Sequence, residues 1–387
     1  MNNTNFPVYQ SCEETFFLER VNRFVMLLQR KNGEKFRAHI PNTGRMEEFC
    51  FEKQPFFVTP QRTAKYSYKV VATRYEGHLI FLDTLKANEL FFQLLVRNRI
   101  PQFQAVTHIQ REVTFGDSRF DFTFVHNRQQ IIAEIKSCTL CHNSLAMFPD
   151  APTLRGQKHL NRLEQLADGQ QIVSYVIFLV LNSSAERFMP NFHTDFEYGK
   201  RFLAANNVQF RAYKLDFIDP VTVNLASLQT VPIDFAAART HCQNRGSYLL
   251  VLENPEDRVL SVGKLGEIFF QRGWYVYVGS AMQGLDSRLQ RHQRKRKKQH
   301  WHIDYIASTM MKVKKVYPIR KIDRIESELA RAVGNISDSR IKGFGASDVP
   351  EDSHLFYFHT TPLKNRAFIK EILNARHSVN GKNVIFV

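Results

Sequence analysis

The sequence lacks the features that would tie it to a membrane or to an oxidising compartment: it has only five cysteines in 387 residues and no long apolar run. A membrane-spanning helix needs about 20 consecutive apolar residues, so we expect none. The first ten residues, MNNTNFPVYQ, lack the charged region and apolar core of a secretory signal. An odd number of scattered cysteines is typical of reduced thiols rather than of a disulfide framework. We therefore expect a cytoplasmic protein with no membrane partner.

The segment CTLCH, from Cys138 to His142, matches the pattern of covalent haem attachment. That attachment normally requires export, and the segment directly follows an expected strand, so we expect no haem. A zinc site needs about four ligands, and the sequence has no second C-x-x-C. A redox pair and two buried core thiols remain as interpretations, and the second is favoured.

The charge balance is the strongest bulk signal. The chain has 53 Lys and Arg against 37 Asp and Glu, a formal net charge of +16. A field of this sign concentrates polyanions around a protein, so DNA is the expected partner. RNA is a weaker alternative because no paired aromatic RNP-like motif is present. An anionic membrane surface would require a long amphipathic basic helix, which we do not find.

The length and the 43% hydrophobic content predict a globular protein of two or three domains. Between residues 16 and 83, short apolar runs alternate with turn signals, which is typical of a small β-barrel. Helices and strands then alternate, and the apolar run at 172–181 predicts a strand buried on both faces of a mixed sheet. We expect an α+β and α/β multidomain chain: a barrel at 1–84, a second domain at 85–225, a linker at 226–244, a third domain at 245–362 and a tail at 363–387.

Residues 118–137, SRFDFTFVHNRQQIIAEIKS, predict two antiparallel strands joined by a short polar loop. Side chains alternate along a strand, so Glu134 and Lys136 share a face. Asp121 interrupts a run of phenylalanines on the first strand, a costly place for an acid without a partner. Two carboxylates on neighbouring strands can hold a divalent cation, and the lysine can orient a water that attacks a phosphate. A simple salt bridge between the strands is the alternative.

Two further segments place cations where a phosphate could bind. Residues 41–46, PNTGRM, predict a tight turn that is either only a turn or a loop whose amides and Arg45 meet phosphate. An expected helix after residue 153 carries Arg155 and Lys158 in its first turns, where a helix N-terminus suits a phosphate. A solvated basic face is the alternative there.

The last third of the chain has its own set of candidate residues. Two apolar segments that carry Tyr248 and Tyr277 predict neighbouring strands. Arg288 and His292 are four residues apart and therefore share one face of a helix. Glu326 begins another predicted helix.

Between these segments lies a dense cationic run. Such a run can be only a solvated face, but on a basic protein phosphate contact is at least as well supported. Its members are Arg294, Lys295, Arg296, Lys297 and Lys298.

The ordered set PNTGRM, DTLKAN, REVTFGDSRFDF, EIKS and FPDAPTLRGQKHL resembles the sugar fermentation stimulation protein family over about residues 14–225. The resemblance implies an OB-fold barrel followed by a PD-(D/E)-x-K restriction-endonuclease-like domain, in a family described as DNA-binding. It implies that Asp121, Glu134 and Lys136 occupy metal and water positions, with Glu112 as a further candidate acid. Many nucleases of this superfamily also place an acid on the helix before the sheet, where this sequence has Glu89.

Residues of about 245–362 resemble the GIY-YIG nuclease superfamily, specifically a compact branch of unassigned function. The matching pieces surround Tyr248 and Tyr277, Arg288 with His292, WHIDY, Glu326 and GFGASD. The resemblance implies that the tyrosines assist the attacking water, that the arginine holds the phosphate, and that one glutamate binds a single divalent metal.

This second segment also departs from the pattern of its superfamily. Ser247 and Val278 each replace a usual isoleucine, and the two half-motifs are separated by a longer segment. Glu328 competes with Glu326 for the metal role.

Two functional hypotheses follow. The first is a DNA endonuclease that depends on Mg²⁺ or Mn²⁺ and has two nuclease-like centres. The second is a non-catalytic DNA-binding or regulatory protein, for which we expect strongly salt-dependent binding without a cleavage product.

Overall fold

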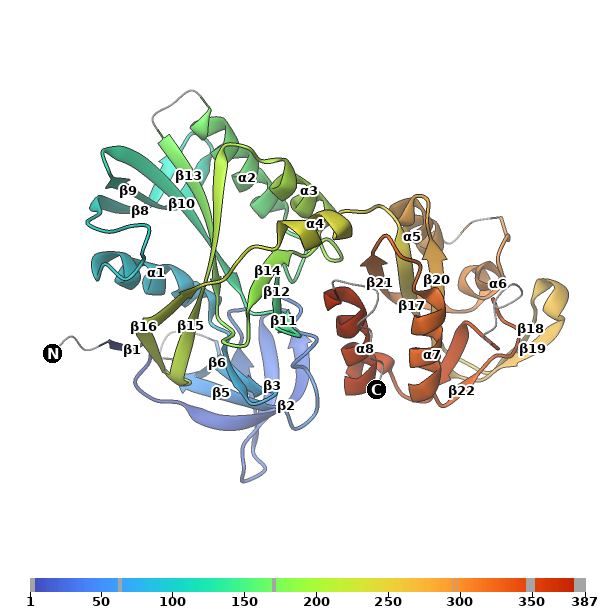
Figure 1. Cartoon of the computed structure of the whole chain (residues 1–387). Helices are drawn as coiled ribbons and strands as arrows, with labels where there is room; N and C mark the ends of the chain where they lie inside the picture. Colours follow the sequence, from blue (N-terminus) through green and yellow to red (C-terminus); the bar gives the residue numbers. More distant parts are fainter. Residues whose placement is uncertain are drawn as a thin grey trace. The chain divides into compact units, whose positions relative to one another are not determined.

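The structure is a computed structural model that describes residues 4–61, 65–168, 172–294, 296, 298–345 and 352–378. The chain forms two compact units, residues 1–238 and 239–387. Figure 1 shows a blue barrel and a green mixed sheet in the first unit, and an antiparallel sheet with helices in the second. The expected multidomain α/β fold class is therefore confirmed.

The barrel at the start of the first unit closes because β4 pairs with both β3 and β6. Its interior is filled by apolar side chains from alternate strand positions, among them Met26, Leu28 and Phe56. The strands are β2 (Glu13–Asn22), β3 (Val25–Gln29), β4 (Lys35–His39), β5 (Pro55–Pro60), β6 (Tyr68–Tyr75) and β7 (His78–Phe81).

A seven-stranded sheet follows the barrel in the order β1-β16-β15-β13-β10-β9-β8. The central strands β10, β13 and β15 are parallel, and the outer pairs are antiparallel. The strands are β8 (Thr107–Phe115), β9 (Ser118–His126), β10 (Gln129–Cys138), β13 (Ile172–Val180), β15 (Val208–Asp219) and β16 (Thr222–Thr230). A small sheet is formed by β11 (Cys141–His142), β12 (Leu145–Phe148) and β14 (Arg187–Pro190).

Helices cover both faces of the seven-stranded sheet, so the central strands are buried on both sides, as the apolar run of β13 predicts. Helix α1 (Ala87–Val96) packs on the face that carries Ile131 and Ala133. Helices α2 (Leu154–Ala167) and α3 (Phe196–Ala204) pack on the face that carries Ile132. The expected helix–strand–strand–strand order is present.

Two parts of the first unit differ from our expectation. Strand β1 (Asn5–Pro7) pairs with β16 at the edge of the sheet, so the first residues complete the sheet rather than the barrel. Regular structure also fills the segment expected as a linker, since β16 extends to Thr230 and is followed by α4 (Phe235–His241). The periodic signal in this segment is weak because only two residues of β16, Val223 and Leu225, are buried.

The second unit has a five-stranded sheet in the order β21-β17-β20-β23-β22 and a separate hairpin, β18–β19. Strands β17 and β20 are antiparallel neighbours, which confirms the expected pairing. The strands are β17 (Gly246–Asn254), β18 (Arg258–Ser261), β19 (Glu267–Phe270), β20 (Gly273–Ala281), β21 (Lys312–Arg320), β22 (Ser339–Arg340) and β23 (Leu355–Phe358). The helices are α5 (Leu285–Gln293), α6 (His302–Thr309), α7 (Glu326–Ile336) and α8 (Arg366–His377).

Helix α8 lies in the segment that we expected as a tail without a role. Its buried side chains include Phe368, Ile369 and Ile372, and the helix packs against α7 and β21. An amphipathic helix that buries one apolar face is part of the fold. The described part of the second unit therefore extends to Ser378.

The N-terminal segment is tied to the first unit by one buried acid. The Tyr9 hydroxyl donates to Asp83, which is fully buried and also pairs with Lys69 at 2.8 Å. Because hydrogen bonds to charged groups contribute about 1.5–3 kcal/mol, we expect Tyr9→Phe to lower the free energy of unfolding of the first unit by about that amount in urea. The partly exposed Tyr66→Phe is the control, and equal unfolding midpoints for the two variants would contradict this role of Tyr9.

Candidate functional sites

The first candidate site is built on the β9–β10 hairpin. Asn127 and Arg128 both have positive φ, +49° and +63°, which gives the two-residue turn that matches the twist of a hairpin. The ladder between the strands ends where Phe122 faces Ala133. Asp121 is therefore the first residue of β9 that has no partner in the ladder with β10.

Strand β9 rotates at this point. Phe120 belongs to the core under α2, whereas Phe122 belongs to the core under α1, although alternate residues of a regular strand share a face. The Asp121 carboxylate replaces the missing strand partner: it accepts from the backbone N–H of Ile135 at 2.7 Å and from the Asn88 amide of α1 at 2.7 Å. Burial and the neighbouring Glu134 carboxylate raise the pKa of Asp121 to about 6.

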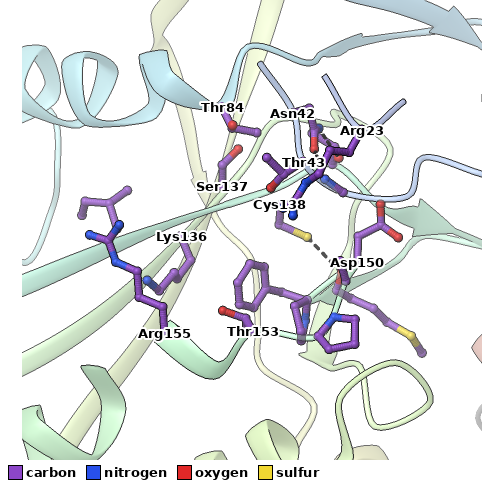
Figure 2. A pocket seen from close by; sticks show the side chains of 18 of the residues that line it. Arg23, Asn42, Thr43, Thr84, Lys136, Ser137, Cys138, Asp150, Thr153 and Arg155 are labelled. Carbon is purple, nitrogen blue, oxygen red and sulfur yellow. Dashed lines mark hydrogen bonds between the residues drawn. The ribbon is translucent and has the colours of Figure 1, made fainter. Parts of the chain in front are cut away.

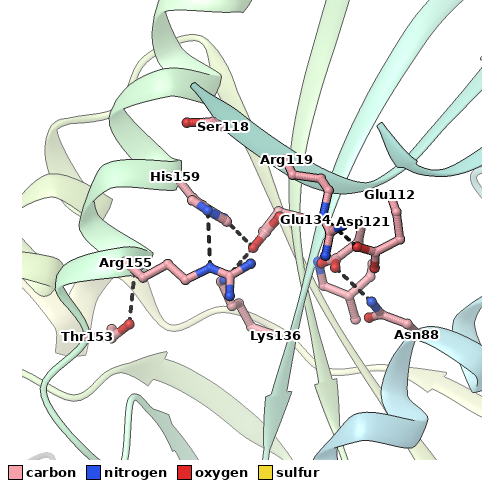
Figure 3. A network of polar contacts seen from close by, with 12 residues as sticks. Asn88, Glu112, Ser118, Arg119, Asp121, Glu134, Lys136, Thr153, Arg155 and His159 are labelled. Carbon is pink, nitrogen blue, oxygen red and sulfur yellow. Dashed lines mark hydrogen bonds and ion pairs between the residues drawn. The ribbon is translucent and has the colours of Figure 1, made fainter. Parts of the chain in front are cut away.

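Glu134 is the buried carboxylate of this site, with 3% of its surface exposed. Its Oε1 lies 2.5 Å from Lys136 Nζ and 2.6 Å from His159 Nδ1. Burial raises the pKa of Glu134, but Lys136 and His159 outweigh burial, so the pKa is lowered and the group stays ionised. No described residue donates a hydrogen bond to the buried Oε2. Figure 3 shows these side chains converging from β9, β10 and α2.

His159 comes from α2, which begins after Thr153 because the Thr153 hydroxyl accepts from the backbone N–H of Gly156. Arg155 Nε donates to His159 Nε2 at 3.4 Å, so the imidazole carries its proton on Nδ1 and donates it to Glu134. The sequence analysis did not select His159. Its spacing of four residues from Arg155 on an expected helix could have indicated that the two side chains share a face.

The other acids that we considered near this site have different partners. Glu112 pairs with Arg119 at 2.9 Å, and Glu89 pairs with Arg111 at 3.0 Å. Helix α1 instead contributes Asn88, an amide, to Asp121. Asn88 ends the DTLKAN segment of the family resemblance, but nothing in the sequence linked it to Asp121, because only the rotation of β9 brings the two side chains together.

A pocket of about 540 Å³ adjoins this site and lies between the barrel and the sheet domain. Lys136 and Arg155 line one part of it, and Asn42, Thr43 and Gly44 of the barrel turn line another (Figure 2). The turn thus faces the pocket, but Arg45 is not among the lining residues that are described.

The barrel turn is held against the sheet domain by two contacts. Asp150 accepts from the backbone N–H of Met46 at 2.8 Å, and the Asn42 amide donates to Thr139. Burial raises the pKa of Asp150 to about 6. A side chain at Gly44 would lie 2.6 Å from the Asp150 carboxylate, so the close approach requires glycine there.

The two cations predicted at the start of α2 are both exposed. Lys158 pairs with Asp117 at 2.8 Å, while Arg155 lies at the pocket.

The two cysteines of the CTLCH segment are buried. Cys138 and Cys141 are free thiols, and burial raises the pKa of both, to about 11 for Cys141. A thiol of such high pKa is a poor nucleophile.

The residues of the first site fit a divalent cation. A cation between Asp121 and Glu134 would satisfy Oε2 of Glu134 and remove the repulsion between the two carboxylates. Mg²⁺ keeps several waters and needs only one or two protein carboxylates. Within the described ranges, no cluster of three or more His, Cys, Asp or Glu side chains is arranged for a metal.

The second candidate site is a pocket of about 280 Å³ in the second unit. Tyr248 on β17, Tyr277 on β20, Arg288 on α5 and Glu326 on α7 all line it, so the structure brings together four residues selected from the sequence. Glu328 is not among the described lining residues. Gly279, opposite Tyr248 in the strand pair, is needed because a side chain there would lie 2.6 Å from the Tyr248 ring.

His292 lies behind Tyr248 rather than in the pocket lining. It is buried on α5, and its Nε2 is 2.8 Å from the Tyr248 hydroxyl. Burial raises the pKa of both Tyr248 and Tyr277 above the usual range, so both phenols stay protonated. The guanidinium of Arg288 stacks on Trp301, 3.8 Å from the ring centroid.

Glu326 is enclosed by donors. Its Oε2 accepts from the Ser280 hydroxyl and from Arg324 Nε and Nη2 at 2.9 and 2.6 Å, and its Oε1 lies 3.2 Å from His354 Nδ1. Burial raises the pKa of Glu326, but His354, Ser280 and Arg324 outweigh burial and lower it to about 2. A metal at Oε2 would have to displace a guanidinium, so this donor set does not fit the metal that the GIY-YIG resemblance implies.

The cationic run after α5 is only partly described. Arg294, Arg296 and Lys298 are exposed, while Lys295 and Lys297 lie outside the described residues. Within the described ranges, no helix has the length and apolar character needed to cross a bilayer.

Three domain families match the chain. The SfsA N-terminal OB domain matches residues 18–82, the sugar fermentation stimulation protein RE domain matches residues 85–219, and a domain of unknown function, DUF123, matches residues 247–376. Relatives named sugar fermentation stimulation protein homolog occur in Desulforamulus reducens, 36% identical over 183 residues, and in Natranaerobius thermophilus, 36% identical over 202 residues. These matches cover 47% and 50% of this chain, and 76% and 83% of the relatives.

A solved structure of Pyrococcus furiosus SfsA in complex with Ca²⁺ is 28% identical, with a TM-score of 0.52 over 59% of this chain and 99% of that one. The fold is thus an OB-like barrel joined to a mixed-sheet domain, with a further domain after it. The chain belongs to the sugar fermentation stimulation protein family, and its second unit carries the DUF123 domain. Both resemblances seen in the sequence are confirmed.

The contacts of Glu326 predict a pH-dependent stability. Its pKa is lowered on folding, so the ionised carboxylate stabilises the second unit above about pH 4.5, and this contribution is lost as the pH falls toward 2. We expect Glu326→Gln to lower the free energy of unfolding at pH 7 by about 1–3 kcal/mol, with a difference from the parent chain that shrinks below pH 4.5. Chemical denaturation from pH 7 to 3 measures this, with Glu328→Gln as control; a difference that stays constant with pH would contradict it.

Proposed function

We propose that this chain is a DNA nuclease with two nuclease-like centres. The first, at Asp121, Glu134 and Lys136, depends on a divalent metal, and the second lies in the pocket of Tyr248 and Glu326. One observation carries the proposal: a buried Glu134 oxygen, to which no described residue donates, next to a second buried carboxylate. The related Pyrococcus furiosus protein forms a complex with Ca²⁺. Ca²⁺ and Mg²⁺ share a preference for oxygen ligands.

In the first centre, Asp121 and Glu134 would hold Mg²⁺ or Mn²⁺. When bound, such an ion supplies positive charge to the scissile phosphate and lowers the pKa of a coordinated water. The chain's own residues prepare the rest of the site. His159 and Lys136 both hold Oε1 of Glu134, and no described residue donates to Oε2. Lys136 lines the pocket, where its ammonium attracts a phosphate and orients the attacking water.

In the second centre, the high pKa of Tyr248 argues against a phenolate base. We propose that Tyr248 relays a proton instead: its oxygen accepts a proton from the attacking water while its own proton passes to Nε2 of His292. The resulting hydroxide attacks the phosphorus, and the departing alkoxide takes a proton from solvent. Arg288 would hold the phosphate oxygens, and Tyr277 would orient the water from the opposite strand.

DNA is the proposed partner because of the net charge and the exposed cations near both centres. Arg155 lies at the first pocket, and α5 leads directly into the cationic run near the second. Such contacts are mainly to phosphates, so we propose a binding affinity that falls steeply with salt. The proposed phosphate contacts are Arg45, Arg155, Lys158, Arg294, Lys295, Arg296, Lys297 and Lys298.

Cleavage of supercoiled plasmid tests the proposal. In Mg²⁺ or Mn²⁺ the parent chain should nick or cut plasmid, and Glu134→Ala should lower the metal-dependent rate by at least about 10²-fold, since it removes charge stabilisation at the phosphate. The double variant Glu134→Ala, Glu326→Ala should be inactive.

The exposed Glu186→Gln serves as the matched control and should cut like the parent chain. Cleavage that persists unchanged in the double variant would refute the assignment. If DNA binds in a salt-dependent way but no product forms with any metal, the chain is a DNA-binding protein without turnover.

The second centre can be isolated by a further substitution. In the Glu134→Ala background, Tyr248→Phe should reduce the remaining cleavage by about 10²-fold or more, because the proton relay to His292 is broken. The control is Tyr305→Phe, a tyrosine of the same unit outside the pocket lining. Equal rates for the two variants would remove Tyr248 from the mechanism.

A further inference from the structure

We propose that the pocket of the second unit binds a phosphate oxyanion without a divalent cation, and that the guanidinium of Arg324, anchored on Glu326, supplies the positive charge there together with Arg288. This inference rests on the proposed function of the second centre and specifies how that centre recognises its substrate. It assigns Arg324, which the sequence motifs did not indicate, as a substrate-binding residue.

In the ion pair between Arg324 and Glu326, the glutamate is buried and the arginine is accessible from the pocket. The Glu326 side chain is 9% exposed, whereas the Arg324 side chain is 53% exposed and lines the pocket. Two nitrogens of the guanidinium, Nε and Nη2, lie within 2.9 Å of the same carboxylate oxygen. A guanidinium is a planar fork of five donors, so it can hold a carboxylate and a phosphate oxygen at the same time.

The charges that line the pocket favour an anion. Two guanidinium groups, Arg288 and Arg324, face one carboxylate, Glu326, which leaves an excess of positive charge. Stacking on Trp301 fixes the plane of Arg288. Two fixed guanidinium groups are a common means of stabilising charge on a phosphate.

The same charges disfavour a metal ion. A divalent cation at Oε2 of Glu326 would have to replace Arg324, and one at Oε1 would have to displace His354, whose Nδ1 lies 3.2 Å from that oxygen. At either oxygen the cation would be repelled by the guanidinium groups of Arg288 and Arg324. No second carboxylate is among the described lining residues, so nothing there would offset this repulsion. The low pKa of Glu326 is consistent with a carboxylate whose charge is already compensated.

The size of the pocket agrees with a phosphate group as its occupant. Its volume of about 280 Å³ leaves room for a phosphate group and part of the chain that carries it. Ser280, His300 and His302 add polar side chains to its lining. His302 already accepts from the backbone N–H of Gly345 through Nδ1, so its neutral imidazole presents Nε2–H as a donor.

The chain contains an intrinsic reporter for this pocket. It has two tryptophans, and Trp301 lines the second pocket while Trp274 lies elsewhere in the unit. In a full-length chain with Trp274→Phe and Glu134→Gln, fluorescence reports on Trp301 alone, and the proposed metal centre of the first unit is weakened. Inorganic phosphate is the probe, titrated in EDTA and in MgCl₂ and followed by fluorescence and by calorimetry.

We expect phosphate to bind with the same affinity in EDTA and in MgCl₂. Arg324→Gln should weaken binding at least about tenfold, because it removes one of two charge-assisted contacts. The control is Arg331→Gln, an exposed arginine of the following helix, α7, that is not among the described lining residues of this pocket. Binding that requires Mg²⁺, binding that Arg324→Gln leaves unchanged, or no binding by either method would overturn the proposal.

Counting bound Mn²⁺ by electron paramagnetic resonance gives an independent result. The number of bound ions should be the same with and without Glu326→Gln, and the loss of one ion in that variant would overturn the proposal. Neither measurement involves DNA cleavage. A chain that binds phosphate as expected but never cuts DNA would therefore refute the nuclease function alone.

Discussion

The first unit depends on a buried ionised carboxylate that has to be paired. Glu134 lies inside the sheet domain, where an isolated charge would be strongly destabilising. Lys136 on the same strand and His159 on α2 provide the pairing. The position of His159 depends in turn on the start of α2, where Asp195 accepts from the Thr153 backbone N–H at 2.8 Å and also caps α3. One charge thus couples a strand and two helices, and it leaves one carboxylate oxygen to which no described residue donates.

The second unit also contains a buried carboxylate that has to be paired, but its partners differ in kind and number. This carboxylate, Glu326, begins α7 and its partners surround it, and Arg324 and Ser280 share one of its oxygens. The first carboxylate has an oxygen to which no described residue donates and a second acid beside it, so its site offers oxygen ligands to a cation. The second has a guanidinium already in place. The two acids look equivalent in sequence, but Glu134 can still accept a cation whereas Glu326 is already paired with one. Only the hydrogen-bond donors around each carboxylate reveal this difference.

The sequence predicted those features that depend on local pattern. The hairpin around Asn127 follows from polar turn residues between two apolar strands, and the pairing of Glu134 with Lys136 follows from strand alternation. It did not predict the contact of Asn88 with Asp121, because a regular β9 would not place that carboxylate beside α1. Nor did it place Asn5–Pro7 in the sheet, since three residues carry no periodic signal and their pairing with β16 spans most of the unit.

The pocket of the first unit explains why the barrel and the sheet domain occur together. The barrel turn at Asn42–Gly44 forms a wall of the same pocket that Lys136 and Arg155 line. That wall is held from the other domain, because Asp150 binds the Met46 backbone and Thr139 binds Asn42. Gly44 permits the close approach, since a side chain there would overlap the Asp150 carboxylate. A barrel separated from the sheet would lose the acceptor that shapes its turn, and the sheet would lose one side of its pocket. The two domains consequently form one site, in which the barrel determines the shape of the space beside Lys136.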